Sequence, residues 1–279
     1  MNCLHSFGRS AGLFRKDAVE AGVPAALLAI GGLPCVQSDG PALLSLVSSI
    51  RDLVSLWIFG RFPPVFSRFA PLLYTLADLP GVTASSETAS LVALGFGRLV
   101  AGKAIEVSAG LVRAIVRLAT LPSIAESGVA VNNIVDAFCE LIRGDPGRAV
   151  CVEGGVVAAL VSFARLDALQ LDFSVNQVAR AIWLIADFSE AGAQACVKGG
   201  ALHALVPLAR AEAGARRVGA VPSISMALAA LGRCEEGRQE GRELDVTYAL
   251  SKFIALEDVA ADDEVVLEVV RALRVYMGD

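Results

Sequence analysis

Two thirteen-residue stretches, 45 positions apart, nearly repeat each other and constrain the fold more than any other feature. The first is CVEGGVVAALVSF, which begins at Cys151, and the second is CVKGGALHALVPL, which begins at Cys196. Self-similarity at a fixed period of roughly 20–50 residues is the signature of repeat architectures. We therefore expect a fold built by stacking similar units along the chain.

One position within the repeat carries this period along the rest of the chain. It is held by Gly155 and Gly200 in the two clear copies. In the weaker copies it is held by Gly22, Phe69, Gly110 and Glu243. The successive spacings are 47, 41, 45, 45 and 43 residues. This regularity predicts about five to six structural repeats.

Each unit contains helical runs and shows no pattern typical of strands. Apolar residues recur three and four positions apart, which places them on one face of a helix. These residues are Val157, Leu160, Val161 and Ala164 in one copy, and Leu202, Leu205, Val206 and Ala209 in the next. A polar or Pro-containing break and a longer helical run, such as VNNIVDAFCELI or VNQVARAIWLIADF, follow. No segment alternates with period two between hairpin turns, so we expect an all-α fold.

The repeated glycine predicts a hinge between two helices of one unit. Glycine adopts positive φ and permits close helix approach because it lacks a Cβ. A helix pair cannot bury its apolar stripe alone, so each unit packs on the next and the core continues along the array. Cys151 and Cys196 hold the same position in adjacent copies. A repeated cysteine favours a buried packing role over a unique nucleophile.

These units resemble armadillo repeats. The residues that carry the resemblance are the hinge V-x-x-G-G/A-hydrophobic-x-x-A-L-V and a third helix of the type A-h-x-x-L, best matched over Ala149–Gly241. The resemblance implies a right-handed α-solenoid of about five to six degenerate repeats. It also implies that the third helices line a concave groove for extended peptides or partner domains. No catalytic activity and no cofactor are implied.

Polar residues on two expected third helices are candidates to face this groove. They are Asn132, Asn133, Asp136, Glu140, Asn176, Arg180 and Asp187. The ladder of Trp and Asn by which some armadillo proteins recognise nuclear-import cargo is absent here. Trp183 is the only Trp on a third helix of the well-matched repeats, and Asp187 stands where Asn is expected. A simply solvated face is the alternative for each polar residue, and core packing is the alternative for Trp183.

Two further segments could serve binding. Residues 60–74 contain a possible hot-spot patch of Phe62 and Phe66 beside Arg61 and Arg68, for which burial in the core is the alternative. Residues 243–279 carry a net charge of −6, whereas residues 1–242 carry +1. This acidic end could meet a basic partner, or it could be the polar cap that a terminal repeat needs.

The chain offers little support for a catalytic, metal or nucleic-acid site. It has two isolated histidines, His5 and His203, and six cysteines without a C-x-x-C pair, so no zinc site is expected. Neither Gly-containing segment with a Lys, GRSAGLFRK or GFGRLVAGK, has the spacing of a phosphate loop. The balanced charge of the body lacks the basic footprint of a nucleic-acid binder.

The organisation and location follow from composition. We expect an N-terminal arm over residues 1–16 and one solenoid domain over 17–279, with a C-terminal cap from about 243. No transmembrane segment is expected, because charges, Pro and Gly interrupt the apolar runs. Scattered cysteines and the lack of a secretory signal indicate an intracellular and cytoplasmic protein. The faintly presequence-like N-terminus leaves a mitochondrial location open, and a cytoskeletal or ciliary assembly is a further alternative.

Together these observations predict a non-enzymatic scaffold or adaptor for other proteins. Apolar residues make up 55% of the chain and its mean hydropathy is +0.60, which favours a permanent subunit of a larger hetero-oligomeric assembly. A groove-type carrier of peptides or cargo is one alternative. A regulatory subunit of an enzyme complex is another.

Overall fold

The computed structural model describes residues 21–55, 64–166, 172–214 and 218–278. Nineteen α-helices and one 3-10 helix occur in these ranges, and no strand does. The all-α prediction is confirmed. The chain divides into two compact units, Met1–Leu141 (unit 1) and Ile142–Asp279 (unit 2).

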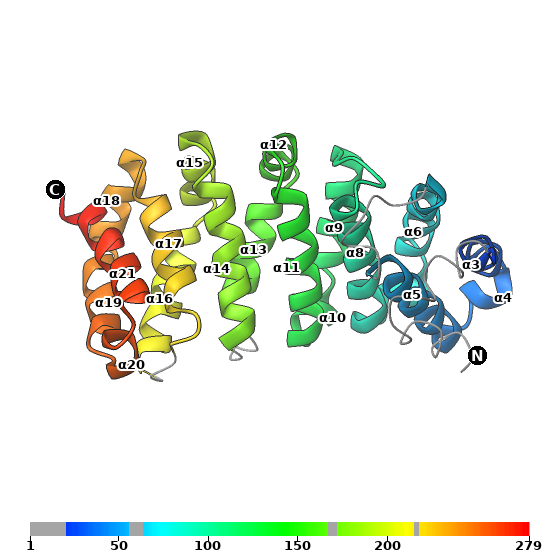
Figure 1. Cartoon of the computed structure of the whole chain (residues 1–279), viewed down its shortest axis with the longest axis horizontal. Helices are drawn as coiled ribbons and strands as arrows, with labels where there is room; N and C mark the ends of the chain where they lie inside the picture. Colours follow the sequence, from blue (N-terminus) through cyan, green and yellow to red (C-terminus); the bar gives the residue numbers. More distant parts are fainter. Residues whose placement is uncertain (1–20, 56–63, 167–171, 215–217, 279) are drawn as a thin grey trace. The chain divides into compact units, whose positions relative to one another are not determined.

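Unit 1 contains three successive groups of helices, each ending in a long third helix. The groups are α3 (Val23–Gly31), α4 (Pro34–Gln37) and α5 (Gly40–Ser55); the 3-10 helix Pro64–Arg68, α6 (Phe69–Ala77), α7 (Pro80–Thr83) and α8 (Ser86–Ala101); and α9 (Ala109–Ala119), α10 (Pro122–Ala125) and α11 (Gly128–Ile142). The long helices α5 and α8 pack side by side, and α6 packs against α8 (Figure 1).

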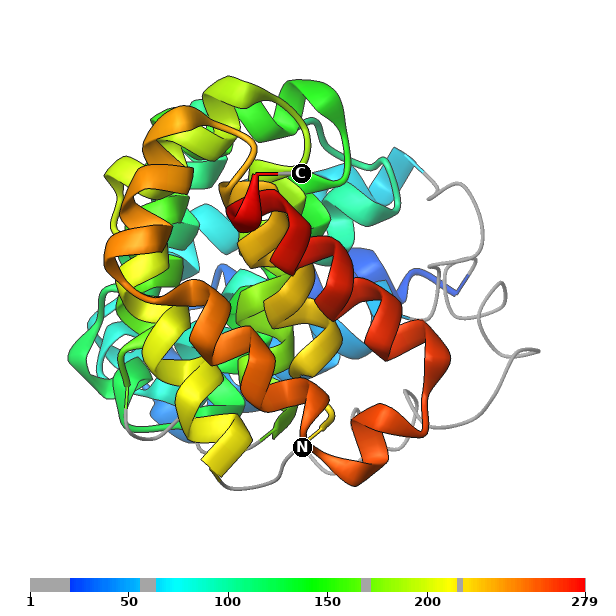
Figure 2. The same cartoon turned by 90° about the vertical axis from the view of Figure 1, so that its left-hand side faces the viewer.

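Unit 2 contains three groups that each begin with an additional helix. The groups are α12 (Asp145–Glu153), α13 (Val156–Ala164) and α14 (Asp172–Ala186); α15 (Glu190–Lys198), α16 (Ala201–Gly214) and α17 (Val221–Leu231); and α18 (Glu235–Glu243), α19 (Val246–Ile254), α20 (Glu257–Ala260) and α21 (Asp263–Met277). In Figure 2, α17 and α21 lie on one side of unit 2, and α16 and α19 lie on the other. The third helices α14, α17 and α21 pack in sequence.

The hinge prediction is confirmed at the two clear copies and at the weak copy Gly22, whose φ is +81° at the start of α3, and it is wrong at two other weak copies. Gly155 and Gly200 adopt φ of +88° and +82° at the starts of α13 and α16. In the last group the left-handed residue is Asp245 (φ +54°), whereas Glu243 is the last residue of α18. Gly110 lies inside the first turn of α9, where Ser108 caps the helix by accepting a hydrogen bond from the amide of residue 111. The serine cap takes the place of the glycine turn in that group.

The predicted apolar face forms the core of unit 2. All eight apolar residues named above for the two clear copies are buried. Cys151 and Cys196 are fully buried, and burial raises the pKa of each thiol to about 12. The repeated cysteines therefore fill the core as predicted, and a thiol of such high pKa is a poor nucleophile.

A one-turn helix between the second and third helices recurs in four groups and was not predicted. In each case a Leu with extended backbone precedes a four-residue helix that buries one Val or Ile. The helices are α4, α7, α10 and α20, and the buried residues are Val36, Val82, Ile124 and Val259. Six residues after the Leu stands a Ser or Asp, and Ser85, Ser127 and Asp262 cap the helix that follows. The shared sequence L-P-x-V/I-x-x-S/D was the available signal for this turn in unit 1.

In the described ranges, no single helix has the length and hydropathy that a membrane crossing requires. The helices α12 and α13 meet that requirement only when they are taken together, and they are bent by 74° at the break between them.

Candidate functional site

The candidate site of unit 2 is centred on the exposed side of α17. Helices α14 and α21 pack on the two flanks of α17, and α16 packs behind it. The positions of α17 that stay partly open are spaced three and four residues apart, so they form one face. They are Pro222, Ser223, Met226 and Ala229, followed by the exposed Arg233 after the helix.

The neighbouring helix α14 continues this open side. Its partly open positions include Asn176, Arg180, Trp183 and Leu184, and Asp187 follows the helix. Two contacts join the sides of α14 and α17. The Ser223 hydroxyl donates a hydrogen bond of 2.5 Å to Oδ1 of Asn176. The Arg233 guanidinium lies 2.7 Å from Oδ1 of Asp187 and donates to its carbonyl oxygen at 3.2 Å. These cross-helix contacts fix the register of the two helices.

Helix α21 completes the side. It packs on α17 through Tyr276, whose hydroxyl donates 2.7 Å to the carbonyl oxygen of residue 228, and it buries Val269 and Ala272. Opposite these buried residues lie Leu267, Val270, Arg271 and Arg274, again three and four apart. Leu267 is 48% exposed. We call the open sides of α14, α17 and α21 together the third-helix face of unit 2.

The corresponding positions of α5, α8 and α11 form the third-helix face of unit 1. Asn133 Nδ2 of α11 donates a hydrogen bond of 3.2 Å to the hydroxyl of Ser90 on α8. Arg98 of α8 lies 3.6 Å from the carboxylate of Glu140 on α11. Both contacts join successive third helices, as the Asn176 contact does in unit 2.

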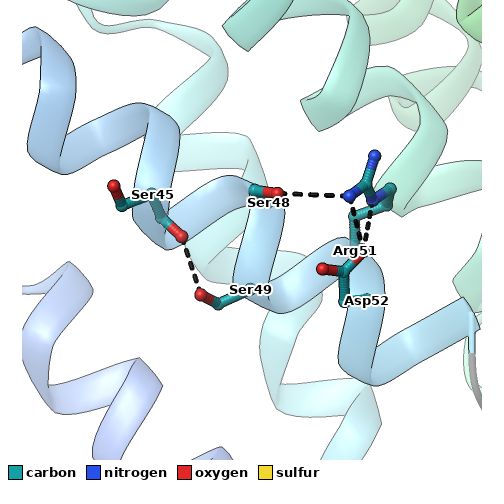
Figure 3. A network of polar contacts seen from close by, with 5 residues as sticks. All are labelled: Ser45, Ser48, Ser49, Arg51 and Asp52. Carbon is teal, nitrogen blue, oxygen red and sulfur yellow. Dashed lines mark hydrogen bonds and ion pairs between the residues drawn. The ribbon is translucent and has the colours of Figure 1, made fainter. Parts of the chain in front are cut away.

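Helix α5 carries a polar network of its own (Figure 3). The Arg51 Nε donates to the Asp52 carboxylate at 2.7 Å, and its Nη2 donates to the Ser48 hydroxyl at 3.2 Å. The Ser49 hydroxyl donates to the carbonyl oxygen of Ser45 at 2.7 Å. The charges on this helix are therefore neutralised locally.

The predicted groove residues fall on these two faces with one correction. Asn132, Asn133 and Asp136 are half-buried on α11, and Asn176, Arg180 and Asp187 lie on the unit 2 face. Glu140 does not face solvent: it is only 8% exposed, because it packs against α8 beside Arg98. Trp183 is half-buried. Sequence reasoning missed Ser90, Ser223, Met226 and Leu267.

The serines could have been found by aligning the third helices. Ser90 and Asn133 lie 43 residues apart, and Asn176 and Ser223 lie 47 apart, close to the repeat period. A small polar residue at this period in successive third helices is the signal. Met226 and Leu267 have no such signal, because the sequence alone does not show which apolar residues stay uncovered.

In the structure, the possible hot-spot patch at residues 60–74 loses one of its predicted exposed aromatic residues. Phe66 is fully buried and packs on Phe69 with the ring centroids 6.0 Å apart, so it is not an exposed anchor. Arg68 is exposed. Arg61 and Phe62 lie outside the part of the chain that the structure describes.

The described residues hold no cluster of His, Cys, Asp and Glu that could bind a metal ion. His203 is exposed on α16, and its Nδ1 lies 2.9 Å from the carboxylate of Glu240 on α18. It stands apart from both third-helix faces. The chemistry that the two faces offer is hydrogen bonding, charge pairing and apolar contact.

No family model matches the sequence, and no curated protein matches it. Solved structures do match the fold. An engineered protein from structural genomics superimposes with a TM-score of 0.68 at 15% identity, over 92% of this chain and 99% of that one. A designed armadillo repeat protein gives 0.62 at 18% identity, over 90% and 98%. Another, solved in complex with the peptide (KR)4, gives 0.63 at 19% identity over the same shares. The groups of helices, the glycine hinges and these likenesses agree, and the chain has the fold of an armadillo repeat protein.

Proposed function

We propose that this chain is a non-enzymatic protein–protein interaction scaffold that acts as a structural subunit of a larger assembly. The observation that carries the proposal is the open side of the third helices in each unit. On α17 this side is left uncovered although neighbours pack on both flanks and behind. It offers apolar side chains, amides, hydroxyls and charges, which is the mixture that protein interfaces use.

The comparisons support a binding role of this general kind. The armadillo-repeat fold is suited to protein binding, and one designed neighbour is described in complex with a peptide. The five cysteines that the structure describes are free thiols, which supports the proposed intracellular location. That residues 17–279 form one solenoid domain is part of the proposal, as is a hetero-oligomeric assembly with protein partners and without nucleic acid.

The test is recovery of the partner from the native cell. The tagged chain is purified by affinity, and the co-purifying proteins are identified by mass spectrometry. The molar mass of the complex is then measured by light scattering. We expect a partner in fixed stoichiometry that is retained at high salt. A chain that is recovered alone, and that is a monomer by light scattering, contradicts the assembly role.

A groove-type peptide carrier is a second candidate, favoured by the designed neighbour that was solved with a bound peptide. A carrier exchanges its cargo, whereas an assembly subunit keeps its partner. Mixing the purified complex with an excess of untagged chain separates the two roles: rapid partner exchange indicates a carrier, and retention indicates a subunit.

A further inference from the structure

We propose that the third-helix face of unit 2 receives a protein segment in which acidic side chains stand beside large apolar ones. The proposal deepens the scaffold function and rests on it, because it names the chemistry of the partner. It commits to one occupant: an acidic and apolar segment of another protein.

The apolar part of this face crosses three adjacent helices. Its members are Trp183 and Leu184 on α14, Met226 and Ala229 on α17, and Leu267 and Val270 on α21. Single exposed apolar residues are normal, but apolar residues gathered on three adjacent helices offer a larger apolar surface to a partner. Trp is the residue type most enriched among interface hot spots, and Met adapts its shape to a partner. The patch therefore suits large apolar side chains from the bound segment.

The carboxyl-terminal part of the face is positive. It carries four arginines, Arg180, Arg233, Arg271 and Arg274. Arg233 pairs with Asp187, and Arg271 lies 2.6 Å from the Glu268 carboxylate. Within the described ranges Arg180 and Arg274 form no ion pair, and both side chains are exposed. Two uncompensated cations beside an apolar patch favour a segment that brings carboxylates.

The position of these cations also orients the segment. Asp262, Asp263 and Glu264 stand at the first turn of α21, whereas Arg274 stands in its last turn. The amino-terminal end of α21 repels an acidic segment, and the carboxyl-terminal end of α21 attracts it. We expect its carboxylates to lie along the carboxyl-terminal halves of α14, α17 and α21, where Arg180 and Arg233 also lie.

The face of unit 1 does not share this chemistry. Its charges Arg51 and Asp52 pair with each other, and Arg98 lies beside Glu140. The unit 1 face therefore provides a comparison within the same protein.

The test is an unbiased peptide selection on the full chain. A random peptide library displayed on phage is selected against the immobilised protein, and enriched peptides are synthesised and measured by fluorescence anisotropy. We expect enrichment of Asp or Glu together with Leu, Phe, Trp or Met. The Arg180→Glu and Arg274→Glu double variant weakens binding about tenfold, because each reversal turns an attraction into a repulsion.

A matched control separates the face from total charge. Arg113→Glu and Arg165→Glu together change the net charge equally at two exposed positions, one on α9 and one directly after α13, and leave binding unchanged. Trp183→Ala weakens binding about 30-fold as the loss of an aromatic anchor. Circular dichroism checks its fold, and the exposed arginine variants keep the test decisive if Trp183→Ala unfolds.

Several results overturn the inference. They are enrichment of Lys-rich or Arg-rich peptides, no enrichment of any peptide, or equal weakening by the control pair. None of these decides the scaffold function, which fails only when no native partner is recovered. Conversely, if the Arg180→Glu and Arg274→Glu variant retains a native partner, that result supports the scaffold function and contradicts this inference.

Discussion

Substituting the hinge glycine Gly200 by Ala tests how the repeats are built. Gly200 adopts φ of +82° at the start of α16. An L-residue in this left-handed conformation costs about 1–2 kcal/mol. The smaller freedom of Ala in the unfolded chain offsets about 0.4–1 kcal/mol of that cost. The nearest atom to the new Cβ is Nη2 of Arg165 at 3.1 Å, the end of a flexible side chain that can move. We therefore expect a loss of about 1 kcal/mol in the free energy of unfolding.

Gly110→Ala is the matched control with the opposite expected sign. The sequence pattern places Gly110 at the same hinge position, but the structure places it in the first turn of α9 with only the Ser108 hydroxyl near, 3.9 Å from a new Cβ. Ala is favoured over Gly in a helix, so this variant should gain roughly 0.5 kcal/mol.

The assay is urea unfolding followed by circular dichroism, with the midpoint compared at unchanged slope. The expected result is a lower midpoint for Gly200→Ala and a higher one for Gly110→Ala. Equal shifts in one direction, or a neutral Gly200→Ala, would refute the assignment of the hinges.

Three further predictions concern packing and pH. Gly237→Ala should cost about 2–3 kcal/mol, because its Cβ would lie 2.0 Å from the carbonyl oxygen of Leu231; thermal unfolding measures the loss. Ser223→Ala removes the hydroxyl that donates across to α14 and should cost about 1 kcal/mol in the same assay. The thiols of Cys151 and Cys196 have pKa values raised by burial from 9.0 to about 12, so the folded state holds these protons longer and stability is full below pH 9. It should fall as pH rises from 9.0 to about 12, by up to about 1.4 kcal/mol per pH unit for each thiol. Urea midpoints across this range should therefore drop less for Cys151→Ala than for the parent, and equal drops would contradict the assignment.

The repeat pattern could be predicted from the sequence wherever it depends on the conformational preference or the spacing of neighbouring residues. The hinges at Gly155 and Gly200 follow from the need for positive φ, and the buried apolar face follows from helical spacing. Gly110 was misassigned because a glycine can stand in a first turn when a neighbouring Ser caps the helix. Asp245 was missed because Asp tolerates the left-handed region without showing it in a glycine pattern.

The candidate site was less predictable, because exposure depends on what packs from other repeats. Asn176 and Arg180 were correctly placed on a third helix, yet nothing local shows that Ser223 supplies the partner of Asn176. Glu140 has the spacing of an open polar residue and is nevertheless buried beside Arg98. The open apolar positions of unit 2, such as Met226, are visible only once the neighbouring helices are in place.

The most direct test of the binding role is hydroxyl-radical footprinting of the chain alone and in its purified native complex. The account predicts that Trp183 and Met226, on the third-helix face of unit 2, become protected when the partner is bound. Tyr248, which is 55% exposed on α19, and the exposed His203 on α16 should keep their reactivity. Protection of Tyr248 and His203, with Trp183 and Met226 unchanged, would contradict the assignment of the binding face.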